Sequence, residues 1–258
     1  MSHIRLETKG QIAFLTINRP KSLNSFNYEA LVELGKKVDI LHSTREVRAI
    51  IITGEGDKAF SAGADLRERK GLGEAEVRRN VKKIRDVFNS IAQLPQPTIA
   101  AVNGYALGGG FELMLACDFK IAAEHAKMGL TEVSWGIIPG AGGTQRLTRL
   151  IGEMKAKELI FTARKINAHE AFHCGILTKV VSKNSLIPCC LSLAEEIIQN
   201  APLAVAQAKY AIQYGADHDI QTGLAFEANA YEVIIPTRDR IEALEAFNEK
   251  RRPVFIGK

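Results

Sequence analysis

Along the first half of this chain, segments in which hydrophobic and polar residues alternate take turns with segments in which hydrophobic residues recur at helical spacing. Period-two alternation predicts a hairpin of two strands, over Ile4–Thr8 and Gln11–Asn18. Apolar residues at helical spacing then predict a helix over Tyr28–Leu41, and a β-branched run predicts a strand over Val47–Thr53. The order strand, helix, strand is typical of an α/β protein.

The α/β pattern continues for some 70 residues more and then gives way to helices. An amphipathic helix is predicted over Glu74–Leu94, followed by a buried strand over Thr98–Val102 and a short strand over Asp118–Ala123. Later helices are predicted over residues 185–200, 202–214, 221–235 and 238–250. We therefore expect an α/β core in residues 1–184 and a C-terminal helical region in residues 185–258.

Composition places the chain among ordinary globular proteins. It has 258 residues, of which 46% are hydrophobic and 24% charged, so a large core can form and disorder or collagen is excluded. The N-terminus alternates polar with apolar residues, unlike a secretory signal, and no apolar run approaches the roughly 18 residues of a membrane span. We expect a soluble, cytoplasmic protein with no membrane partner.

Net charge and cysteine usage bear on the class of partner and on the redox compartment. The net charge of +5 suits an anionic partner, either nucleic acid or a phosphate-bearing cofactor, and does not choose between them. The four cysteines include no C-x-x-C pair, and Cys189 and Cys190 are adjacent in an apolar helical run. This usage predicts buried free thiols in a reducing compartment.

A glycine-rich segment carries the first chemical signal. Residues 104–110, GYALGGG, follow the strand Thr98–Val102 and open a helix predicted over Phe111–Ala116. The turn therefore places backbone N–H groups at a helix N-terminus, where negative charge is favoured. Alternatively, the glycines only permit a tight turn or close packing. A dinucleotide-binding loop is not favoured, because the spacing is not G-x-G-x-x-G.

Two glutamates lie in apolar settings beside glycine turns. Glu112 is flanked by Phe111 and Leu113, and residues 104–118 contain no lysine or arginine to neutralise it. Glu132 follows in GLTEVSWGIIPGAGG, again among apolar residues and glycines. Burial raises the pKa of a carboxyl toward neutrality, as a general acid or base requires. The alternatives are a distant ion pair for the first glutamate and a helix-start carboxylate for the second.

Five motifs resemble those of the crotonase, or enoyl-CoA hydratase/isomerase, superfamily. They are FSAGADLRER from Phe60, TIAAVNGYALGGGFEL from Thr98, AKMGLTE from Ala126, IPGAGGTQRL from Ile138 and KELIFTAR from Lys157. They follow the family's order and spacing, and the resemblance runs from about Leu6 to the C-terminus. It implies an α/β fold, a spiral of repeated ββα turns, with C-terminal helices that pack on a neighbour in a homotrimer, usually a dimer of trimers.

The resemblance also implies the chemistry of a hydro-lyase. Family members that hydrate 2-enoyl-CoA thioesters to 3-hydroxyacyl-CoA carry two glutamates, at the positions filled here by Glu112 and Glu132, whereas many relatives with other chemistries lack one or both. By resemblance, Glu112 helps to take a proton from water as its oxygen attacks C3, and Glu132 delivers a proton to C2. The N–H groups of Ala64 and Gly109 would form an oxyanion hole for the thioester oxygen. No separate cofactor is implied, because coenzyme A belongs to the substrate.

A set of contacts with the CoA arm is implied in the same way. Some follow the first hairpin or surround the loop of residues 62–65, here called the A-G-A-D loop, and two would reach in from a neighbouring subunit. Those within one chain are Lys21, Ser22, Leu23, Lys58, Ala62, Asp65, Leu66 and Arg67, and those from the neighbour are Phe247 and Lys250. The cations suit phosphates, and the alternative for each is a solvated surface position. At residue 67 relatives often have lysine, so arginine keeps the charge and alters the geometry.

One motif suggests a different chemistry. Residues 169–173 read H-E-x-x-H, a pattern in which two histidines one helical turn apart bind zinc and the glutamate serves as base. Asn167 instead predicts a helix N-cap, with Glu170 completing a capping box and Gly175 ending the helix. The segment also matches a family helix with no metal role, so we expect no metal site.

RNA binding is the alternative from another functional class. The chain most resembles the family branch described as AU-rich RNA binding, whose enzymatic activity is hydration of 3-methylglutaconyl-CoA in leucine breakdown. In those relatives a lysine-rich face of the early helix is implicated in RNA contact. Here residues 27–42 hold only Lys36 and Lys37, offset by three acids, so we do not expect RNA binding. The acyl group stays open between 3-methylglutaconyl and a short straight chain such as crotonyl in fatty-acid breakdown, and enoyl-CoA isomerisation is the alternative reaction.

Overall fold

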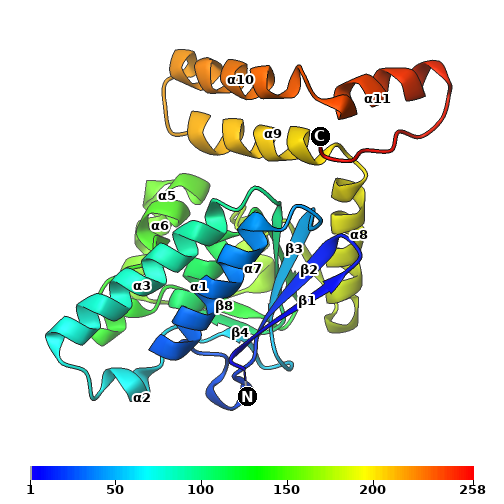
Figure 1. Cartoon of the computed structure of the whole chain (residues 1–258). Coiled ribbons are helices and arrows are strands. Elements are labelled where there is room, and N and C mark those ends of the chain that lie inside the picture. Colours follow the sequence, from blue (N-terminus) through cyan, green and yellow to red (C-terminus); the bar gives the residue numbers. More distant parts are fainter. Residues whose placement is uncertain (1) are drawn as a thin grey trace.

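The alternating residues of the first hairpin form the edge of a six-stranded sheet. β1 (Ile4–Lys9) pairs antiparallel with β2 (Ile12–Ile17), and Gly10 adopts a φ of 58° in the turn between them. The computed structural model, which describes residues 2–258, shows the other strands joining in parallel in the order β1-β2-β3-β5-β7-β10. β1, β2 and β3 lie side by side at one edge of this sheet (Figure 1). They are β3 (Ala49–Gly54), β5 (Thr98–Val102), β7 (Phe119–Ala123) and β10 (Lys179–Val181).

A smaller sheet lies beside the large one and completes the repeat. Its order is β4-β6-β8-β9, and each of its first three strands follows a parallel strand of the large sheet after a short link. The strands are β4 (Ala59–Ser61), β6 (Tyr105–Leu107), β8 (Lys127–Gly129) and β9 (Ile166–Asn167). The sequence pattern did not predict them, because two or three residues are too few to show alternation. The α/β fold with its ββα repeat is confirmed.

Alternate residues of β3 show that both faces of the large sheet are covered. Ile50 and Ile52 belong to the main core beneath α1 and α3, whereas Ile51 faces α8 on the opposite side (Figure 1). Burial on both faces explains the continuous β-branched run of this strand. The three helices are α1 (Tyr28–Ser43), α3 (Glu74–Ala92) and α8 (Leu186–Ile198).

Shorter helices fill the connections between the strands. α4 is buried along its whole length, between α3 and the small sheet. The helices of this group are η1 (Pro20–Ser22), α2 (Leu66–Arg69), α4 (Gly109–Ala116), η2 (Glu132–Trp135), α5 (Gly143–Ile151), α6 (Glu153–Thr162), α7 (Ala168–His173) and η3 (Lys183–Ser185). No helix within residues 2–258 is both long and apolar enough to span a bilayer.

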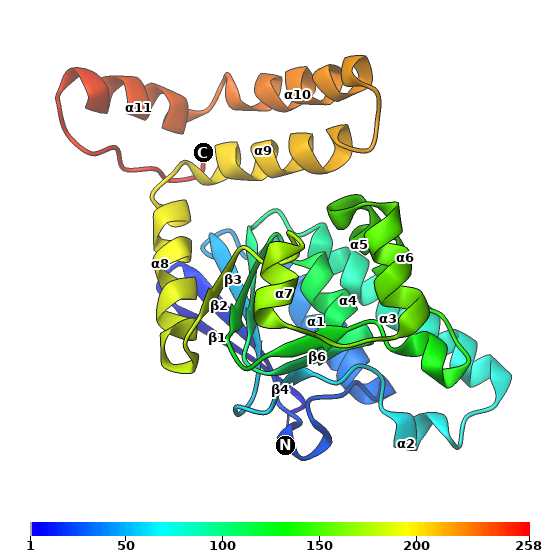
Figure 2. The ribbon, with the colours of Figure 1, turned by 180° about the vertical axis from the view of Figure 1, so that it is seen from behind.

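Three C-terminal helices form a separate layer beyond α8 (Figure 2). α9 and α10 run antiparallel, and the rings of Tyr210 and Phe226 lie 6.0 Å apart between them. The layer is attached to the core by polar contacts, among them a 2.7 Å ion pair between Lys209 Nζ and Asp118 Oδ2. The helices are α9 (Pro202–Gly215), α10 (Ile220–Ile234) and α11 (Arg238–Asn248).

The cysteines are free, but only half of them are buried as predicted. Burial raises the pKa of Cys117 and of Cys190 to about 12. Cys174 and Cys189 are only half-buried. Cys189 precedes Cys190 on α8, and neighbouring positions of a helix point in different directions, so Cys190 is buried between α8 and the sheet while Cys189 packs only at the margin of the same cluster.

Candidate active site

Glu112 lies in the first turn of α4 and is held by the glycine-rich loop of residues 139–143, which leads into α5. The residue is 3% exposed, and its Oε1 accepts hydrogen bonds from the backbone N–H groups of Ala141 and Gly143, each at 2.8 Å. Burial raises the pKa of this carboxyl, while those two amides and the charge of Arg146 oppose the shift. The result is a carboxyl of fixed direction and elevated proton affinity, as a general acid or base needs.

Glu132 begins η2 and lines the same cavity as Glu112. It lies against Gly108, in the glycine turn of residues 104–110. Burial, followed by the charge of Glu112, raises the pKa of the Glu132 carboxyl to about 7. Its Oε2 is buried and has no hydrogen-bond partner in the described part of the chain, while its Oε1 would lie 3.1 Å from a Cβ added at Gly108. This carboxyl is therefore free to exchange a proton with a molecule bound in front of it.

Both glutamates line one cavity of about 770 Å³ between α3 and η2. Its volume is in the range of about 300–1,000 Å³ that is usual for small-molecule sites. Most of its other walls are apolar, and they include Val77, Val81, Ile84, Trp135, Ile137 and Ile138. Burial against these walls raises the pKa of both carboxyls, and the charge of Glu112 adds to the shift of Glu132.

The two predicted oxyanion-hole amides lie at the contact between the A-G-A-D loop and the glycine turn. A Cβ added at Gly109 would lie 3.8 Å from Ala64 N, and one added at Gly63 would lie 2.9 Å from Gly109 N. Neither the Ala64 amide nor the Gly109 amide donates a hydrogen bond to a protein acceptor within residues 2–258. Both residues line the cavity, so two unused donors lie beside the two carboxyls.

Arg146 on α5 supports the loop that holds Glu112. One of its nitrogens donates to the carbonyl of Ala141 at 3.0 Å and the other to Asn89 Oδ1 at 2.7 Å. The N–H of Ala141 donates to Glu112, and the carbonyl of the same residue accepts from Arg146. Arg146 therefore fixes the residue that holds Glu112. The pattern of the sequence did not mark Arg146 as functional, although an arginine shortly after a glycine-rich loop is a usable signal for loop support.

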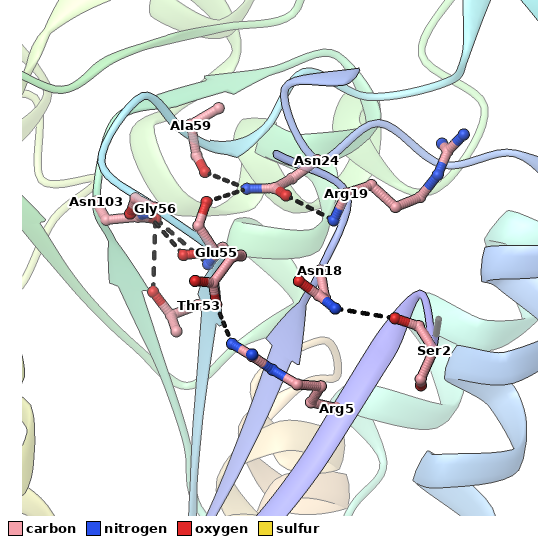
Figure 3. A network of polar contacts seen from close by, with 11 residues as sticks. Ser2, Arg5, Asn18, Arg19, Asn24, Thr53, Glu55, Gly56, Ala59 and Asn103 are labelled. Atoms are coloured by element: carbon pink, nitrogen blue, oxygen red, sulfur yellow. Dashed lines mark hydrogen bonds and ion pairs between the residues drawn. The ribbon is translucent and has the colours of Figure 1, made fainter. Parts of the chain in front are cut away.

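Asparagines tie together the loops that follow β2, β3 and β5 (Figure 3). The Asn24 amide donates to the carbonyls of Glu55 and Ala59, at 3.0 and 2.7 Å. Asn103 donates in the same way to the carbonyls of Gly54, the last residue of β3, and of Gly56, at 2.8 and 2.6 Å. The loop that carries Lys58 is therefore held in a fixed position relative to the loop after β2.

The predicted CoA contacts of the core divide between two cavities. Ala62 and Leu66 line the cavity of the glutamates, whereas Leu23 and Lys58 line a second cavity of about 510 Å³. The two meet where the Ala62 N–H donates to the Leu23 carbonyl at 2.9 Å. Lys21 and Ser22 form η1 just before this contact. The two cavities are therefore neighbours, with one lining residue of each joined by this hydrogen bond.

Asp65 and Arg67 lie at the start of α2. The Asp65 carboxylate accepts from Arg19 Nη2 at 2.9 Å and from the Arg67 N–H at 3.1 Å, so it caps the helix and its pKa stays low despite the opposing effect of burial. The Arg67 side chain is exposed. Phe247 and Lys250, beyond the core on or after α11, line neither cavity of this single chain.

The residues of the H-E-x-x-H motif are engaged in other contacts. His173 Nδ1 lies 2.7 Å from the His169 carbonyl, and the Glu170 carboxylate pairs with Arg164 at 2.5 Å. Asn167 caps α7 as predicted, through a 2.8 Å bond from the Glu170 N–H. The capping box is incomplete, because the ion pair with Arg164 draws the glutamate side chain away from the Asn167 backbone.

The chain matches the model of the Enoyl-CoA hydratase/isomerase family over residues 7–258 and belongs to that family. It is 48% identical over 259 residues to the human mitochondrial methylglutaconyl-CoA hydratase, covering 99% of this chain and 76% of that protein. It is 44% identical over 252 residues to the short-chain-enoyl-CoA hydratase of Clostridium acetobutylicum, covering 98% and 97%.

Solved structures agree with this assignment. The crystal structure of an enoyl-CoA hydratase from Bacillus anthracis superimposes with a TM-score of 0.97 at 48% identity, over 99% of this chain and 100% of that one. The crotonase resemblance drawn from the five motifs is therefore confirmed. Family membership implies an acyl-CoA thioester as substrate.

Proposed function

We propose that this chain adds water across the C2=C3 double bond of a 2-enoyl-CoA thioester. The observation that carries the proposal is the arrangement of the cavity, in which Glu112 and Glu132 both have a raised pKa and lie beside two unused backbone donors. Carboxyls of this kind can exchange protons near neutral pH. The donors can stabilise negative charge on a thioester oxygen.

The reaction follows from these roles. The thioester oxygen accepts hydrogen bonds from the amides of Ala64 and Gly109 while electron density moves onto it from the double bond. The water oxygen bonds to C3 as Glu112 takes one of its protons, and Glu132 gives its proton to C2. One proton then passes from Glu112 back to Glu132 through solvent, so the enzyme returns to its starting state and the product is a 3-hydroxyacyl-CoA.

The CoA arm is assigned to the loops between the two cavities. Lys21, Lys58 and Arg67 offer cations for the phosphates, and Lys250 is proposed to reach the same arm from a neighbouring subunit of a homotrimer or a dimer of trimers. Support for this assembly comes from α11, where Leu244 is 57% and Phe247 81% exposed in one chain. A soluble chain needs a partner surface for an apolar face of this kind.

The names of the relatives offer two acyl groups for this site, a short-chain enoyl group and a methylglutaconyl group. Crotonyl-CoA is the simplest probe of the reaction itself. Incubation with the protein should consume the enoyl thioester and yield a CoA product heavier by one water, with the hydroxyl at C3. A protein that only moves the double bond of a 3-enoyl-CoA, without adding water, would contradict the proposal.

A further inference from the structure

The guanidinium of Arg146 links α5 to α3 and to the loop of residues 139–143. Its Nη1 donates to the Ala141 carbonyl at 3.0 Å, and its Nη2 donates to Asn89 Oδ1 at 2.7 Å. Asn89 lies on α3, the helix that also supplies Ile84 to the cavity wall. A guanidinium presents its donors in a rigid planar fork, so the two acceptors fix its direction.

The loop is fixed between Arg146 on one side and Glu112 on the other. The amides of Ala141 and Gly143 donate to Glu112 Oε1, both at 2.8 Å. A Cβ added at Gly142 would lie 3.0 Å from Arg146 Cζ, so the guanidinium packs directly on the loop backbone. In the described chain, the protein donors to Glu112 bind Oε1 and leave Oε2 to a molecule in the cavity.

Charged groups surround Glu112 on several elements. Burial raises the pKa of its carboxyl, and the charge of Arg146, followed by that of Arg69 at the end of α2, opposes the shift. Glu132 on η2 is the second acid of the cavity, and Arg85 on α3 also lines it. Arg146 is therefore the foremost of the cations that favour the ionised form of Glu112.

Arg146 itself keeps its charge in this half-buried position, because the pKa of a guanidinium lies far above neutrality. Burial lowers that pKa, and the charge of Glu112 opposes the shift. Its other titratable neighbours are Cys117 after α4 and Lys120 on β7. Burial raises the pKa of Cys117 to about 12, so this thiol is neutral and Glu112 is the anion that the guanidinium meets.

We propose that Arg146 is a positioning residue for hydration, which aims Glu112 at the attacking water through the backbone of Ala141 and supplies positive charge behind that carboxylate. This inference rests on the proposed function, because there Glu112 takes a proton from water. A general base has to be ionised and directed at the proton that it removes. The fork of Arg146 provides the direction, and its charge provides the ionisation.

The test compares Arg146→Gln with the wild type in the hydration of crotonyl-CoA, with kcat and KM measured across a range of pH. The variant should lower kcat by about 10- to 100-fold, since a small displacement of a catalytic group has an effect of this size. Its KM should stay near the wild-type value, because the proposed CoA contacts are unchanged.

The pH profile separates this role from a purely structural one. Glu112 must be ionised, so kcat falls toward low pH as Glu112 takes up a proton, and this fall is the acid limb of the profile. Loss of the positive charge of Arg146 raises the pKa of Glu112 further. The acid limb of Arg146→Gln should therefore move to higher pH, whereas general damage to the fold would lower kcat at every pH alike.

Three further variants divide the effect into charge and direction. Arg146→Lys keeps the charge and should keep the acid limb in place, while kcat stays reduced because an ammonium lacks the fork. Asn89→Leu removes the acceptor on α3 and should also lower kcat without moving the acid limb. Arg78→Gln removes an exposed cation of α3, which pairs with Glu74 at 2.8 Å, and should leave the whole profile unchanged. Thermal unfolding shows whether each variant is folded.

The inference is overturned if folded Arg146→Gln keeps the wild-type kcat, or loses kcat with an unmoved acid limb. An acid limb that moves equally in Arg146→Lys and Arg146→Gln would show that the charge is not the cause. If Arg146→Gln does not fold, wild-type kcat in both Arg146→Lys and Asn89→Leu would overturn the inference. No hydration by the wild-type protein would overturn the proposed function as well.

Discussion

At Glu132 the protein holds a carboxyl that is half-protonated near neutral pH. Burial and the nearby Glu112 raise the pKa of this group to about 7. Its role as proton donor to C2 requires the protonated form, while Glu112 must be ionised to accept a proton from water. The two carboxyls interact, so the apparent pKa values of the reaction belong to the pair.

We expect kcat for crotonyl-CoA to fall as the pH rises through about 7. The reason is that Glu132 loses the proton that it delivers to C2. The measurement is kcat at saturating substrate over a series of buffers of constant ionic strength. A kcat that stays constant or rises across about pH 6 to 9 would exclude Glu132 as the proton donor.

The same shift makes the protein less stable as the pH rises. The pKa of Glu132 is about 7 in the folded state and 4.5 for an ordinary glutamate, so between these two values the folded state binds more protons than the unfolded state. The free energy of unfolding therefore decreases over this window, by about 3 kcal/mol if Glu132 acts alone. Glu132→Gln should raise Tm at about pH 8 and change it little at about pH 4.

Thermal unfolding with Glu7→Gln as a control separates this effect from a general charge effect, because Glu7 is exposed on β1. The control should follow the wild-type curve at both pH values. A Glu132→Gln variant that is less stable than the wild type at the higher pH would show that the carboxylate is stabilising, and the account of its titration would be wrong.

The sequence predicted the two glutamates because their apolar neighbours and adjacent glycines are visible in the chain itself. It assigned no role to the Arg69 side chain, which lies among the charged residues of the segment LRERK and resembles a solvated cation. The place of Arg69 in the cavity wall depends on how α2 is held, with the Glu68 carboxylate accepting from the Tyr28 N–H at 3.1 Å. No local pattern encodes that contact between segments distant in sequence.

Among the elements, the contact between the A-G-A-D loop and the first turn of α4 places the two candidate oxyanion donors. Gly63 permits this contact because its φ is 86° and a Cβ there would lie 2.7 Å from the Leu107 carbonyl and 2.9 Å from Gly109 N. No side chain fits at these distances without moving one loop.

Gly63→Ala should therefore lower kcat by about 10²- to 10³-fold, the usual loss when one oxyanion donor is displaced. The matched control is Gly71→Ala in the link between α2 and α3, where an added Cβ has only an ordinary 3.8 Å contact. Both variants are assayed for kcat and for thermal unfolding. A folded Gly63→Ala protein with wild-type kcat would remove the proposed oxyanion hole.

The long elements were predictable, and the strands of two or three residues were not. The helices over residues 74–92 and 202–215 agree with their predicted ranges to within two residues, because many apolar positions repeat at one spacing. The strands of the small sheet were not predicted, because each forms only by pairing with a strand that is distant in sequence. The oxyanion site depends on those pairings.

For the whole molecule, the C-terminal layer presents an apolar face that one chain does not cover. Ile241, Leu244 and Phe247 recur on α11 and are 47%, 57% and 81% exposed. Such a surface is stable in water when a second subunit buries it. This arrangement fits the expectation that Phe247 and Lys250 serve the CoA arm of a neighbour.

Truncation of residues 237–258 should both weaken the oligomer and raise KM for crotonyl-CoA, with little direct effect on the glutamates. Lys250→Ala should raise KM through loss of a phosphate contact, and by a smaller factor in high salt because ions screen that contact. Size-exclusion chromatography with light scattering gives the mass, and steady-state kinetics gives KM. A truncated protein that keeps both the full assembly and the wild-type KM would contradict this arrangement.

The central claim is that two carboxyls carry the protons of hydration, and its most direct test is the turnover of Glu112→Gln and Glu132→Gln with crotonyl-CoA. General acid or base catalysis contributes about 10²- to 10⁴-fold, so each variant should lose at least about 99% of the wild-type kcat. Binding of the product 3-hydroxybutyryl-CoA, measured by calorimetry, should persist because the CoA contacts are unchanged. If either variant binds the ligand and keeps more than about a tenth of the wild-type kcat, the two-glutamate mechanism is wrong.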